Sequence, residues 1–473
     1  MEAHVGRAKE AFKLSGLPDT AMREAKDRVR AAVVSSGISF PNRTVTVNLA
    51  PADLPKRGTD YDLPIAIGVL AAQRQLPASA SGVIAVGELA LDGSVRPGTG
   101  ILGAAALSAA TGRPCLVARS AAGDAARVPG AAVHPVGSLA EAVDLLRQGL
   151  ETSTLALPAK APLAMSVVPD LAEVRGQPLA RRALELAATG GHHLLLHGPP
   201  GGGKTMLARR LPGILPAMAA DEALEVSLLW SAAGKGRPLA LDPPFRSPHH
   251  TASVAALVGG GSGVLTPGEI SLAHRGVLFL DELGEFPRNV LDSLRQPLED
   301  GVVSVSRRAG VAAFPAQFQM VGASNPCPCG FHGDERRPCE CSPSALARYR
   351  RRLSGPFLDR FDLVIRVSRP AAEAVAGPPG EESAVVRGRV ETARDRQWVR
   401  GSLNRDLSRD ALDGGEFSSE SGGLLRAAVD TGRLTARGYD RVRRVARTIA
   451  DVEGVDEVSD GHVAEALALR GGW

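Results

Sequence analysis

The stretch "HHLLLHGPPGGGKTMLARRL", residues 192–211, contains the pattern Gly198-x-x-x-x-Gly203-Lys204-Thr205. This is the pattern of a P-loop, whose backbone N–H groups surround phosphate oxygens where a strand passes into a helix. An apolar run suited to a buried strand precedes it, which favours an ATP site over an accidental glycine-rich turn. We expect Lys204 to neutralise the β- and γ-phosphates and Thr205 to hold Mg²⁺. The residues predicted to surround the phosphates are Gly198, Pro199, Pro200, Gly201, Gly202, Gly203, Lys204 and Thr205.

Two further strands are predicted to end in polar residues that suit ATP hydrolysis. The first, within "GVLFLDELGEF" (residues 276–286), ends in Asp281 and Glu282. We expect Asp281 to hold Mg²⁺ through water and Glu282 to act as general base on the attacking water. The alternative is a strand followed by an acidic helix cap, which the upstream P-loop disfavours. The second strand, "QFQMVGASN", ends at Asn325, a candidate to position that water.

Two arginines downstream are candidates for sensing the γ-phosphate. Arg360 lies in "FLDRFD", and a ring ATPase needs an arginine supplied by the neighbouring subunit. The alternative for Arg360 is a surface ion pair with Asp359 or Asp362. Arg437 begins a helical pattern in "LTARGYDRVRRVARTIAD" and is a candidate second sensor. Its alternative is a solvated basic helix face.

Four of the five cysteines lie in "SNPCPCGFHGDERRPCECS", residues 324–342, directly after Asn325. Cys327, Cys329, Cys339 and Cys341 could supply four thiolates to a structural Zn²⁺. The single-residue spacing within each pair is tighter than usual, so His332 is an alternative ligand and free buried thiols remain the alternative to a metal. If zinc binds, we expect it to staple this loop to the strand that ends at Asn325.

The length of the chain and its cysteine pattern indicate how many domains it has and in which cellular compartment it is expected. A chain of 473 residues is too long for one core, so two or three domains are expected. Residues 1–150 show an α/β pattern, residues 151–169 a linker rich in Pro and Ala, residues 170–370 a second α/β pattern, and residues 371–473 helices rich in arginine. No apolar run is long enough for a membrane span. The crowded cysteines do not suit a secreted disulfide framework, which predicts a cytoplasmic protein.

These motifs together resemble the magnesium-chelatase-like branch of the AAA+ ATPases, and within it the YifB/ComM family. The matching stretches span nearly the whole chain and include "GLPDTAMREAKDRVRAAV", "GPPGGGKTMLARRLPGILP", "FRSPHHTAS", "GEISLAHRGVLFLDELGEF" and "SNPCPCGFHGD". The resemblance implies an α/β fold with a Lon-protease-like N-terminal domain, an AAA+ core with a parallel sheet, and a C-terminal helical lid. It also implies a homo-hexamer with ATP between subunits, and ComM-type members are understood as DNA branch-migration motors in natural transformation. The first residues, "MEAHVGRAKEAFK", depart from the family, which carries about twenty further residues forming the first strands, so we expect a truncated first domain.

The resemblance to Lon raises the hypothesis of a protease, which the residues disfavour. A Lon-type site needs a serine nucleophile activated by a lysine. The corresponding stretch "RGTDYDLP", residues 57–64, has acids and no serine, and "LDGSVRPGTGIL" has no lysine. We therefore expect a proteolytically inactive domain.

Two segments resemble tools for a polymer substrate. "FRSPHHTAS" carries His249 and His250, and "PLEDGVVSVSRRAGVAAFPAQF" resembles a β-hairpin with Arg307 and Arg308 at its tip. In this branch of ring ATPases such insertions face the central pore, where basic side chains suit a phosphate backbone. The alternative is that they are surface loops or subunit contacts. The leading hypothesis is thus an ATP-driven motor on single-stranded or branched DNA, with a chelatase-like or chaperone-like ATPase that remodels a protein partner as the alternative. A scaffold that does not hydrolyse ATP is disfavoured by Glu282, Asn325 and Arg360.

Overall fold

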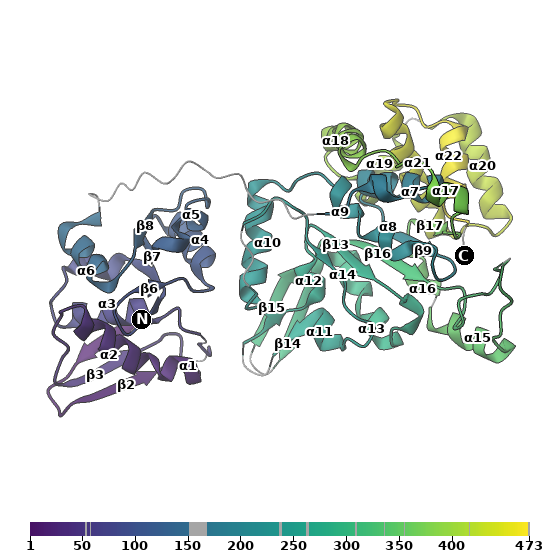
Figure 1. The fold of residues 1–473 in the computed structure, drawn as a ribbon. Helices are drawn as coiled ribbons and strands as arrows, with labels where there is room; N and C mark the ends of the chain where they lie inside the picture. Colours follow the sequence, from purple (N-terminus) through teal and green to yellow (C-terminus); the bar gives the residue numbers. More distant parts are fainter. Residues whose placement is uncertain are drawn as a thin grey trace.

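The structure is a computed structural model. It describes the chain except residues 53, 57, 151–167, 236–238, 262–263, 308–309, 335, 354, 416 and 472–473, and it does not describe the side chains of residues 307 and 310. Most of the predicted linker therefore lies outside the described residues. Figure 1 shows the N-terminal residues on the left and the remainder of the chain on the right.

The N-terminal part is built from two small sheets and the helices around them (Figure 1). One sheet has the order β1-β3-β2, and the other is parallel with the order β4-β7-β8, while β5 and β6 form an antiparallel pair. The strands are β1 (Glu2–Val5), β2 (Ala11–Ser15), β3 (Thr44–Asn48), β4 (Ile84–Val86), β5 (Glu88–Leu89), β6 (Val95–Arg96), β7 (Cys115–Ala118) and β8 (Val133–Val136). The helices are α1 (Thr20–Arg23), α2 (Ala25–Ser35), α3 (Asp62–Ala72), α4 (Ile101–Thr111), α5 (Ala122–Ala125) and α6 (Leu139–Gln148).

The first residues of the chain contribute strands, although their sequence gave no strand signal. Residues 2–5 pair antiparallel with β3, and residues 11–15 pair with its other edge in parallel. The predicted helix after them is present but divided at Glu24 into α1 and α2. The Asp19 side chain accepts a hydrogen bond from the Met22 N–H at 2.9 Å and caps α1. The apolar stripe of this helical region is buried in the N-terminal core.

The central part is a five-stranded sheet with the order β10-β13-β16-β9-β17, in which every pair is parallel. Its strands are β10 (Phe245–Arg246), β13 (Val277–Leu280), β16 (Gln319–Ser324), β9 (Leu194–His197) and β17 (Leu363–Arg366). Because side chains alternate along a strand, Leu194 and Leu196 enter the core on one face of the sheet and Leu195 enters the core on the other. The parallel order brings the carboxyl ends of β13, β16 and β9 to one edge, where the polar residues follow.

Helices surround this sheet, and two small strand pairs extend from it (Figure 1). The helices are α7 (Pro178–Gly190), α8 (Lys204–Ala208), α9 (Leu211–Ile214), α10 (Ala220–Ala232), α11 (Val254–Val258), α12 (Glu269–Leu272), α13 (Arg288–Ser293), α14 (Arg295–Asp300), α15 (Pro343–Arg352) and α16 (Gly355–Leu358). The pairs are β11 (Gly259–Gly260) with β12 (Thr266–Pro267), and the hairpin of β14 (Val302–Arg307) with β15 (Gly310–Pro315). The hairpin predicted from the sequence is thus present.

The C-terminal part is helical in its described residues. It contains α17 (Ala372–Ala376), α18 (Ser383–Val399), α19 (Arg409–Asp413), α20 (Ser419–Asp430), α21 (Ala436–Glu453) and α22 (Asp460–Ala468). Apolar residues of α18, α21 and α22 share one core with α7 and with one face of the central sheet. The lid is therefore packed on the sheet rather than separate from it.

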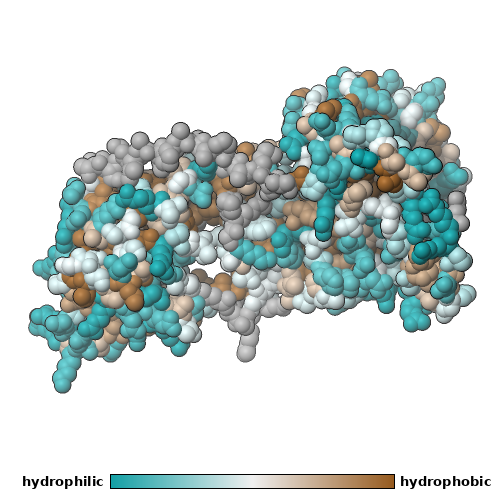
Figure 2. Space-filling view, viewed as in Figure 1, coloured by the Kyte–Doolittle hydropathy of each residue, from teal (hydrophilic) through white to brown (hydrophobic). Residues whose placement is uncertain are grey.

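The N-terminal part contacts the central part through α10. Leu224 and Leu228 of that helix pack against the core cluster that contains Ile101 and Ala105 of α4. The Ser231 hydroxyl also donates a hydrogen bond to the Thr99 carbonyl oxygen at 2.5 Å. On the face seen in Figure 2, hydrophilic residues are spread over both parts, with apolar residues interspersed. Across the described residues, no helix combines the length and apolar character needed to cross a bilayer.

Candidate nucleotide and metal sites

The predicted P-loop, residues 198–205, connects β9 to α8 at the carboxyl edge of the central sheet. Gly201 and Gly203 adopt φ angles of 79° and 87°, which favour glycine. A Cβ atom on Gly198 would lie 2.0 Å from the Val367 carbonyl oxygen, so glycine is required where the loop passes the end of β17. The loop therefore has the close turns that let backbone N–H groups approach a phosphate.

The Lys204 ammonium lies inside this loop. Its Nζ donates hydrogen bonds to the carbonyl oxygens of Gly198 at 2.7 Å and Pro199 at 2.9 Å, and to Asn325 Oδ1 at 3.0 Å. Burial lowers the pKa of Lys204 to about 8, although the carboxylates of Asp281 and Glu282 act in the opposite direction. The lysine therefore contacts the chain at the end of β16.

Thr205 and Asp281 form the second contact between the P-loop and the sheet edge. The Thr205 hydroxyl donates to Asp281 Oδ2 at 2.7 Å. A hydroxyl and a carboxylate beside a phosphate loop are the oxygen donors that Mg²⁺ prefers. These residues, with the P-loop glycines and Lys204, fit a bound Mg-nucleotide.

Glu282 follows Asp281 in a left-handed backbone conformation, with φ 51° and ψ 49°. A non-glycine residue rarely adopts this conformation, and such residues concentrate at functional sites. The Glu282 N–H donates to Asp281 Oδ1 at 3.0 Å, which supports the turn, and its carboxylate remains more than half exposed. Glu282 is thus held by its backbone while its side chain is open to a reactant.

His250 lies beside Glu282, a contact that the sequence does not predict. Its Nδ1 lies 3.4 Å from Glu282 Oε2, and its ring lies 4.1 Å from the ring of His249 between centroids. His249 instead contacts the Thr251 hydroxyl through Nδ1 at 2.9 Å. The sequence predicts that both histidines contact DNA, and the structure places His250 beside Glu282. The strand order explains this contact: β10 and β13 are parallel neighbours, so the loop after β10 lies next to the end of β13.

Asn325 is held from two sides. Its side-chain oxygen accepts the hydrogen bond from Lys204, and its carbonyl oxygen accepts a hydrogen bond from the Tyr349 hydroxyl at 3.0 Å. Tyr349 is buried on α15 and was not singled out from the sequence. It fixes the chain where β16 ends and the cysteine-rich segment begins.

Arg360 and Arg437 lie together, in a different place from the P-loop. Both line a pocket of about 1010 Å³, and its lining within the described chain includes no P-loop residue. Arg360 is buried and donates to Glu299 Oε1 at 2.5 Å and to the Pro356 carbonyl oxygen at 2.6 Å. Arg437 is exposed and has no ion-pair partner among the described residues. The ion pair considered for Arg360 is therefore with Glu299, rather than with Asp359 or Asp362.

Arg441, four residues after Arg437 on α21, has a structural role. It donates to Asp362 Oδ1 at 2.5 Å and to the Arg360 carbonyl oxygen at 2.9 Å. Burial alone would raise the pKa of Asp362, but Arg441 and the neighbouring histidines outweigh it and hold that pKa well below its usual range. Asp362 and Arg441 thus fix α21 to the segment that carries Arg360.

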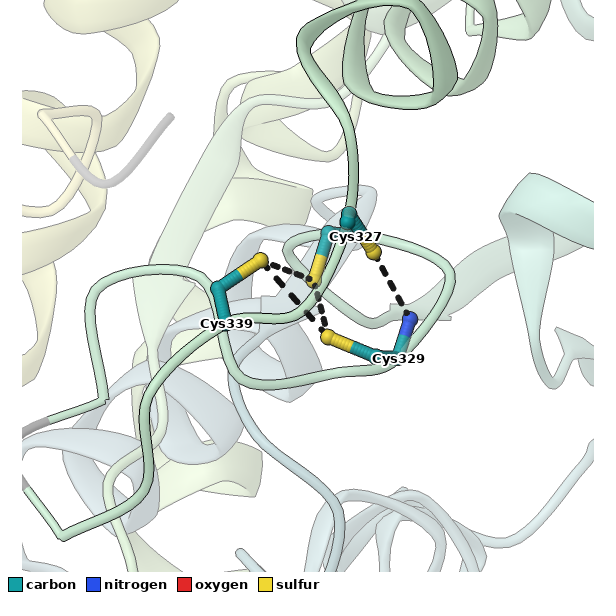
Figure 3. A group of neighbouring side chains, drawn as sticks. Cys327, Cys329 and Cys339 are labelled. Atoms are coloured by element: carbon teal, nitrogen blue, oxygen red, sulfur yellow. Dashed lines mark hydrogen bonds between the residues drawn. The ribbon is translucent and has the colours of Figure 1, made fainter.

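The four clustered cysteines form a second site. The Sγ atoms of Cys327, Cys329, Cys339 and Cys341 all lie within 4.8 Å of one another. Figure 3 shows Cys327, Cys329 and Cys339 with their sulfur atoms turned toward each other. None of the five cysteines is in a disulfide. Four converging thiols are the donor set of a tetrahedral thiolate site.

The remaining predicted substrate contacts are Arg307 and Arg308. Residues 307 and 310 are the last pair of the β14–β15 ladder. Arg308 lies outside the described residues, as does the side chain of Arg307. Val303 and Val305 of the hairpin are buried against the central core, which anchors its base.

The acids that replace a protease site in the N-terminal part have structural partners. Asp62 is fully buried and accepts two hydrogen bonds from Arg28, at 2.7 and 3.0 Å. Asp60 accepts a hydrogen bond from the Gly100 N–H at 2.9 Å and so caps the start of α4. These contacts account for both acids without a hydrolytic role.

Comparison with known proteins agrees with this geometry. Family models match residues 1–120 (subunit ChlI of Mg-chelatase), 170–375 (magnesium chelatase, subunit ChlI) and 380–470 (magnesium chelatase, subunit ChlI C-terminal). The uncharacterized protein YifB of Escherichia coli is 42% identical over 478 residues, covering 99% of this chain and 93% of YifB. The competence protein ComM of Haemophilus influenzae is 42% identical over 494 residues, covering 99% of this chain and 94% of ComM. The chain belongs to the magnesium-chelatase-like YifB/ComM family of AAA+ ATPases.

A weaker similarity to a protein outside this family covers less than half of the chain. The zygotic DNA replication licensing factor mcm6 of Xenopus tropicalis is 23% identical over 219 residues, covering 44% of this chain and 25% of mcm6. Membership of the YifB/ComM family implies ATP and Mg²⁺ as cofactors, and the parallel sheet with its helices is the AAA+ fold that the sequence predicted.

Proposed function

We propose that this YifB/ComM-family ATPase is a hexameric motor that hydrolyses Mg-ATP between subunits and acts on DNA. The observation that carries the proposal is the separation of Arg360 and Arg437 from the P-loop. An arginine that senses a γ-phosphate must reach it, and these two share a pocket whose described lining contains no phosphate loop. A neighbouring subunit presenting its P-loop to that pocket would complete the site, as in ring ATPases that use an arginine finger in trans.

Within one subunit, we assign each residue at the sheet edge a role in hydrolysis. Lys204 and the P-loop glycines bind the phosphates, and Thr205 with Asp281 holds Mg²⁺. Glu282 takes the proton of the attacking water, and Asn325 orients that water. The proposed domains are residues 1–150, a linker at 151–169, the ATPase core at 170–370 and the helical lid at 371–473. We also propose that the four cysteines bind a structural Zn²⁺.

DNA as the substrate is supported by the hairpin and by two relatives. Arg307 and Arg308 are adjacent in the sequence of the segment that forms β14 and β15, and six copies around a pore would present a basic ring to a phosphate backbone. One relative is a competence protein and another a DNA replication licensing factor. Remodelling of a protein partner is the second candidate, favoured by the three matches to a magnesium chelatase subunit.

ATP turnover with and without DNA tests the substrate. We expect single-stranded or branched DNA to raise turnover of the wild-type protein, because an ATPase coupled to a polymer responds to it. Arg307→Gln combined with Arg308→Gln should retain basal turnover and lose this response. The double variant should also bind DNA more weakly. The slope of the logarithm of its DNA-binding constant against the logarithm of salt concentration should become shallower by about one unit per lost phosphate contact. Turnover that neither DNA form changes in the wild-type protein would favour the protein-remodelling candidate.

A further inference from the structure

The cysteine cluster packs directly on the P-loop. The segment that carries it, here called the cysteine loop, comprises residues 326–334 and 336–341. Gly330 of this loop lies against the Pro200 ring, since a Cβ atom there would come within 2.6 Å of Pro200 Cδ and Cγ. Asn325, which accepts the Lys204 hydrogen bond, is only two residues before Cys327. The cysteine loop therefore packs against the P-loop at Pro200.

Arg369 connects the two loops. Its Nε donates to the Pro200 carbonyl oxygen at 2.9 Å, and its Nη1 lies 3.7 Å from Asp334 Oδ2. The same guanidinium lies 5.4 Å from the centre of the Phe331 ring, within the range of a cation–π contact. Arg366, on β17, donates in parallel to the Gly333 carbonyl oxygen at 2.9 Å. Arg369 thus joins the cysteine loop to the P-loop backbone at Pro200.

The positions of the sulfur atoms fit one shared metal ion. Cys327 Sγ lies 3.3 Å from Cys329 Sγ and 3.7 Å from Cys339 Sγ, and the latter two sulfurs are 3.6 Å apart (Figure 3). A Zn–S distance of about 2.3 Å in a tetrahedron gives sulfur separations of about 3.8 Å. Backbone N–H groups also point at the sulfurs, from His332 to Cys327 at 3.3 Å and from Cys329 to Cys341 at 3.4 Å. Such hydrogen bonds favour thiolates.

We propose that a tetrahedral thiophilic metal ion in this cluster sets the affinity of the nucleotide site, with Arg369 as the positioning residue that links them. This rests on the ATP and metal sites proposed above. Without the metal, no coordinate bonds join the four sulfur atoms, so the cysteine loop would be free to open. Gly330 and Arg369 would then no longer support the Pro199–Pro200 turn, to which Lys204 is hydrogen-bonded. Nucleotide binding would therefore respond to metal supply.

The test measures zinc by elemental analysis and the Kd of a fluorescent ATP analogue, on the purified full chain with Mg²⁺. We expect about one zinc per wild-type chain. Cys339→Ser combined with Cys341→Ser should lose the zinc and raise the Kd about tenfold or more, as expected when a supporting hydrogen bond network is lost. Arg369→Gln should keep the zinc and still raise the Kd. Cys115→Ser, at a buried thiol in the N-terminal part, and Arg433→Gln, on the exposed lid, should change neither quantity.

Each outcome decides a different part of the proposal. Wild-type protein prepared without chelator and free of zinc or another thiophilic metal overturns the metal site. A zinc-free double variant with the wild-type Kd overturns the coupling, as does Arg369→Gln with the wild-type Kd. If the double variant fails to fold, as judged by circular dichroism, Arg369→Gln alone decides. Wild-type protein that carries zinc but binds no ATP analogue would instead contradict the proposed ATPase function.

Discussion

At the scale of single residues, the proposed binding residues and the proposed general base are held in different ways. Lys204 and Thr205 are held by hydrogen bonds to the P-loop and to Asp281. Glu282 is held by its backbone, and its carboxylate is exposed. Changes at Lys204 and at Glu282 should therefore have different consequences.

Glu282→Gln should bind Mg-ATP almost normally and hydrolyse it about 10²–10⁴-fold more slowly, because the amide cannot accept the proton from water. Lys204→Ala should weaken binding itself, since it removes the charge inside the P-loop. Nucleotide affinity and single-turnover hydrolysis measured on both variants check the separation. Near-wild-type turnover by Glu282→Gln would remove it from the role of base.

His250→Ala should lower ATP turnover without DNA, by less than Glu282→Gln, because the Glu282 carboxylate loses a neighbour that orients it. His249→Ala is the matched control, since the His249 ring contacts Thr251 instead. Steady-state turnover with and without DNA separates the two histidines. If both served only as DNA contacts, neither change would affect turnover in the absence of DNA.

At the scale of elements, the strands β9, β16 and β17 are joined by a buried histidine. His193 Nδ1 accepts a hydrogen bond from the Met320 N–H of β16 at 3.0 Å. The His193 carbonyl oxygen accepts hydrogen bonds from the N–H groups of Asp362 and Leu363, at 2.9 and 3.1 Å, next to β17. Burial, with some help from nearby arginines, lowers the pKa of His193 to about 3. The neutral ring is therefore part of the native sheet.

The stability of the ATPase part should consequently fall as pH falls from about 6.5 toward 3. In that window the unfolded chain binds a proton that the folded chain excludes, so unfolding is favoured. His193 alone should cost roughly 2 kcal/mol between pH 7 and pH 5. His193→Asn keeps a hydrogen-bond acceptor and removes the titrating group. Between pH 7 and pH 5, the urea-unfolding free energy of this variant should therefore fall by roughly 2 kcal/mol less than that of the wild type. His4→Asn, a change at an exposed histidine, should follow the wild type. An unchanged pH dependence in His193→Asn would contradict this role.

Sequence reasoning located the elements that carry local signals. The P-loop, the strand before Asp281 and the hairpin each have a pattern of fixed spacing, and the structure contains all three. The contacts of His250 with Glu282 and of Arg369 with Pro200 could not be read from spacing, because they join segments that only the strand order brings together. The strands at residues 2–5 and 11–15 were missed because each is only four or five residues long and the β3 strand with which they pair lies about thirty residues or more away in the sequence.

At the scale of the whole molecule, one subunit holds the parts of the proposed hydrolytic site at two places. The P-loop edge carries the side chains proposed to bind phosphate and Mg²⁺, whereas the pocket that contains Arg360 and Arg437 is lined by residues of α10, α14, α18 and α21 and of nearby loops. The hydrogen bonds of Arg441 to Asp362 and to the Arg360 carbonyl oxygen hold α21, which carries Arg437, beside Arg360. This division is the basis for the proposed composite site between subunits, which is the central claim of the proposed mechanism.

Mixing two inactive variants tests that claim most directly. Arg360→Ala should bind nucleotide and lose most turnover, by a factor of about 10³–10⁵ if the arginine acts as a finger. Lys204→Ala should also be inactive, but it retains Arg360. Once co-assembly has been demonstrated by pull-down of differently tagged chains, ATP turnover is measured across mixing ratios. We predict that turnover reappears in the mixture, because an intact P-loop then meets an intact arginine across an interface. Co-assembled mixtures that remain inactive at every ratio would contradict the site between subunits.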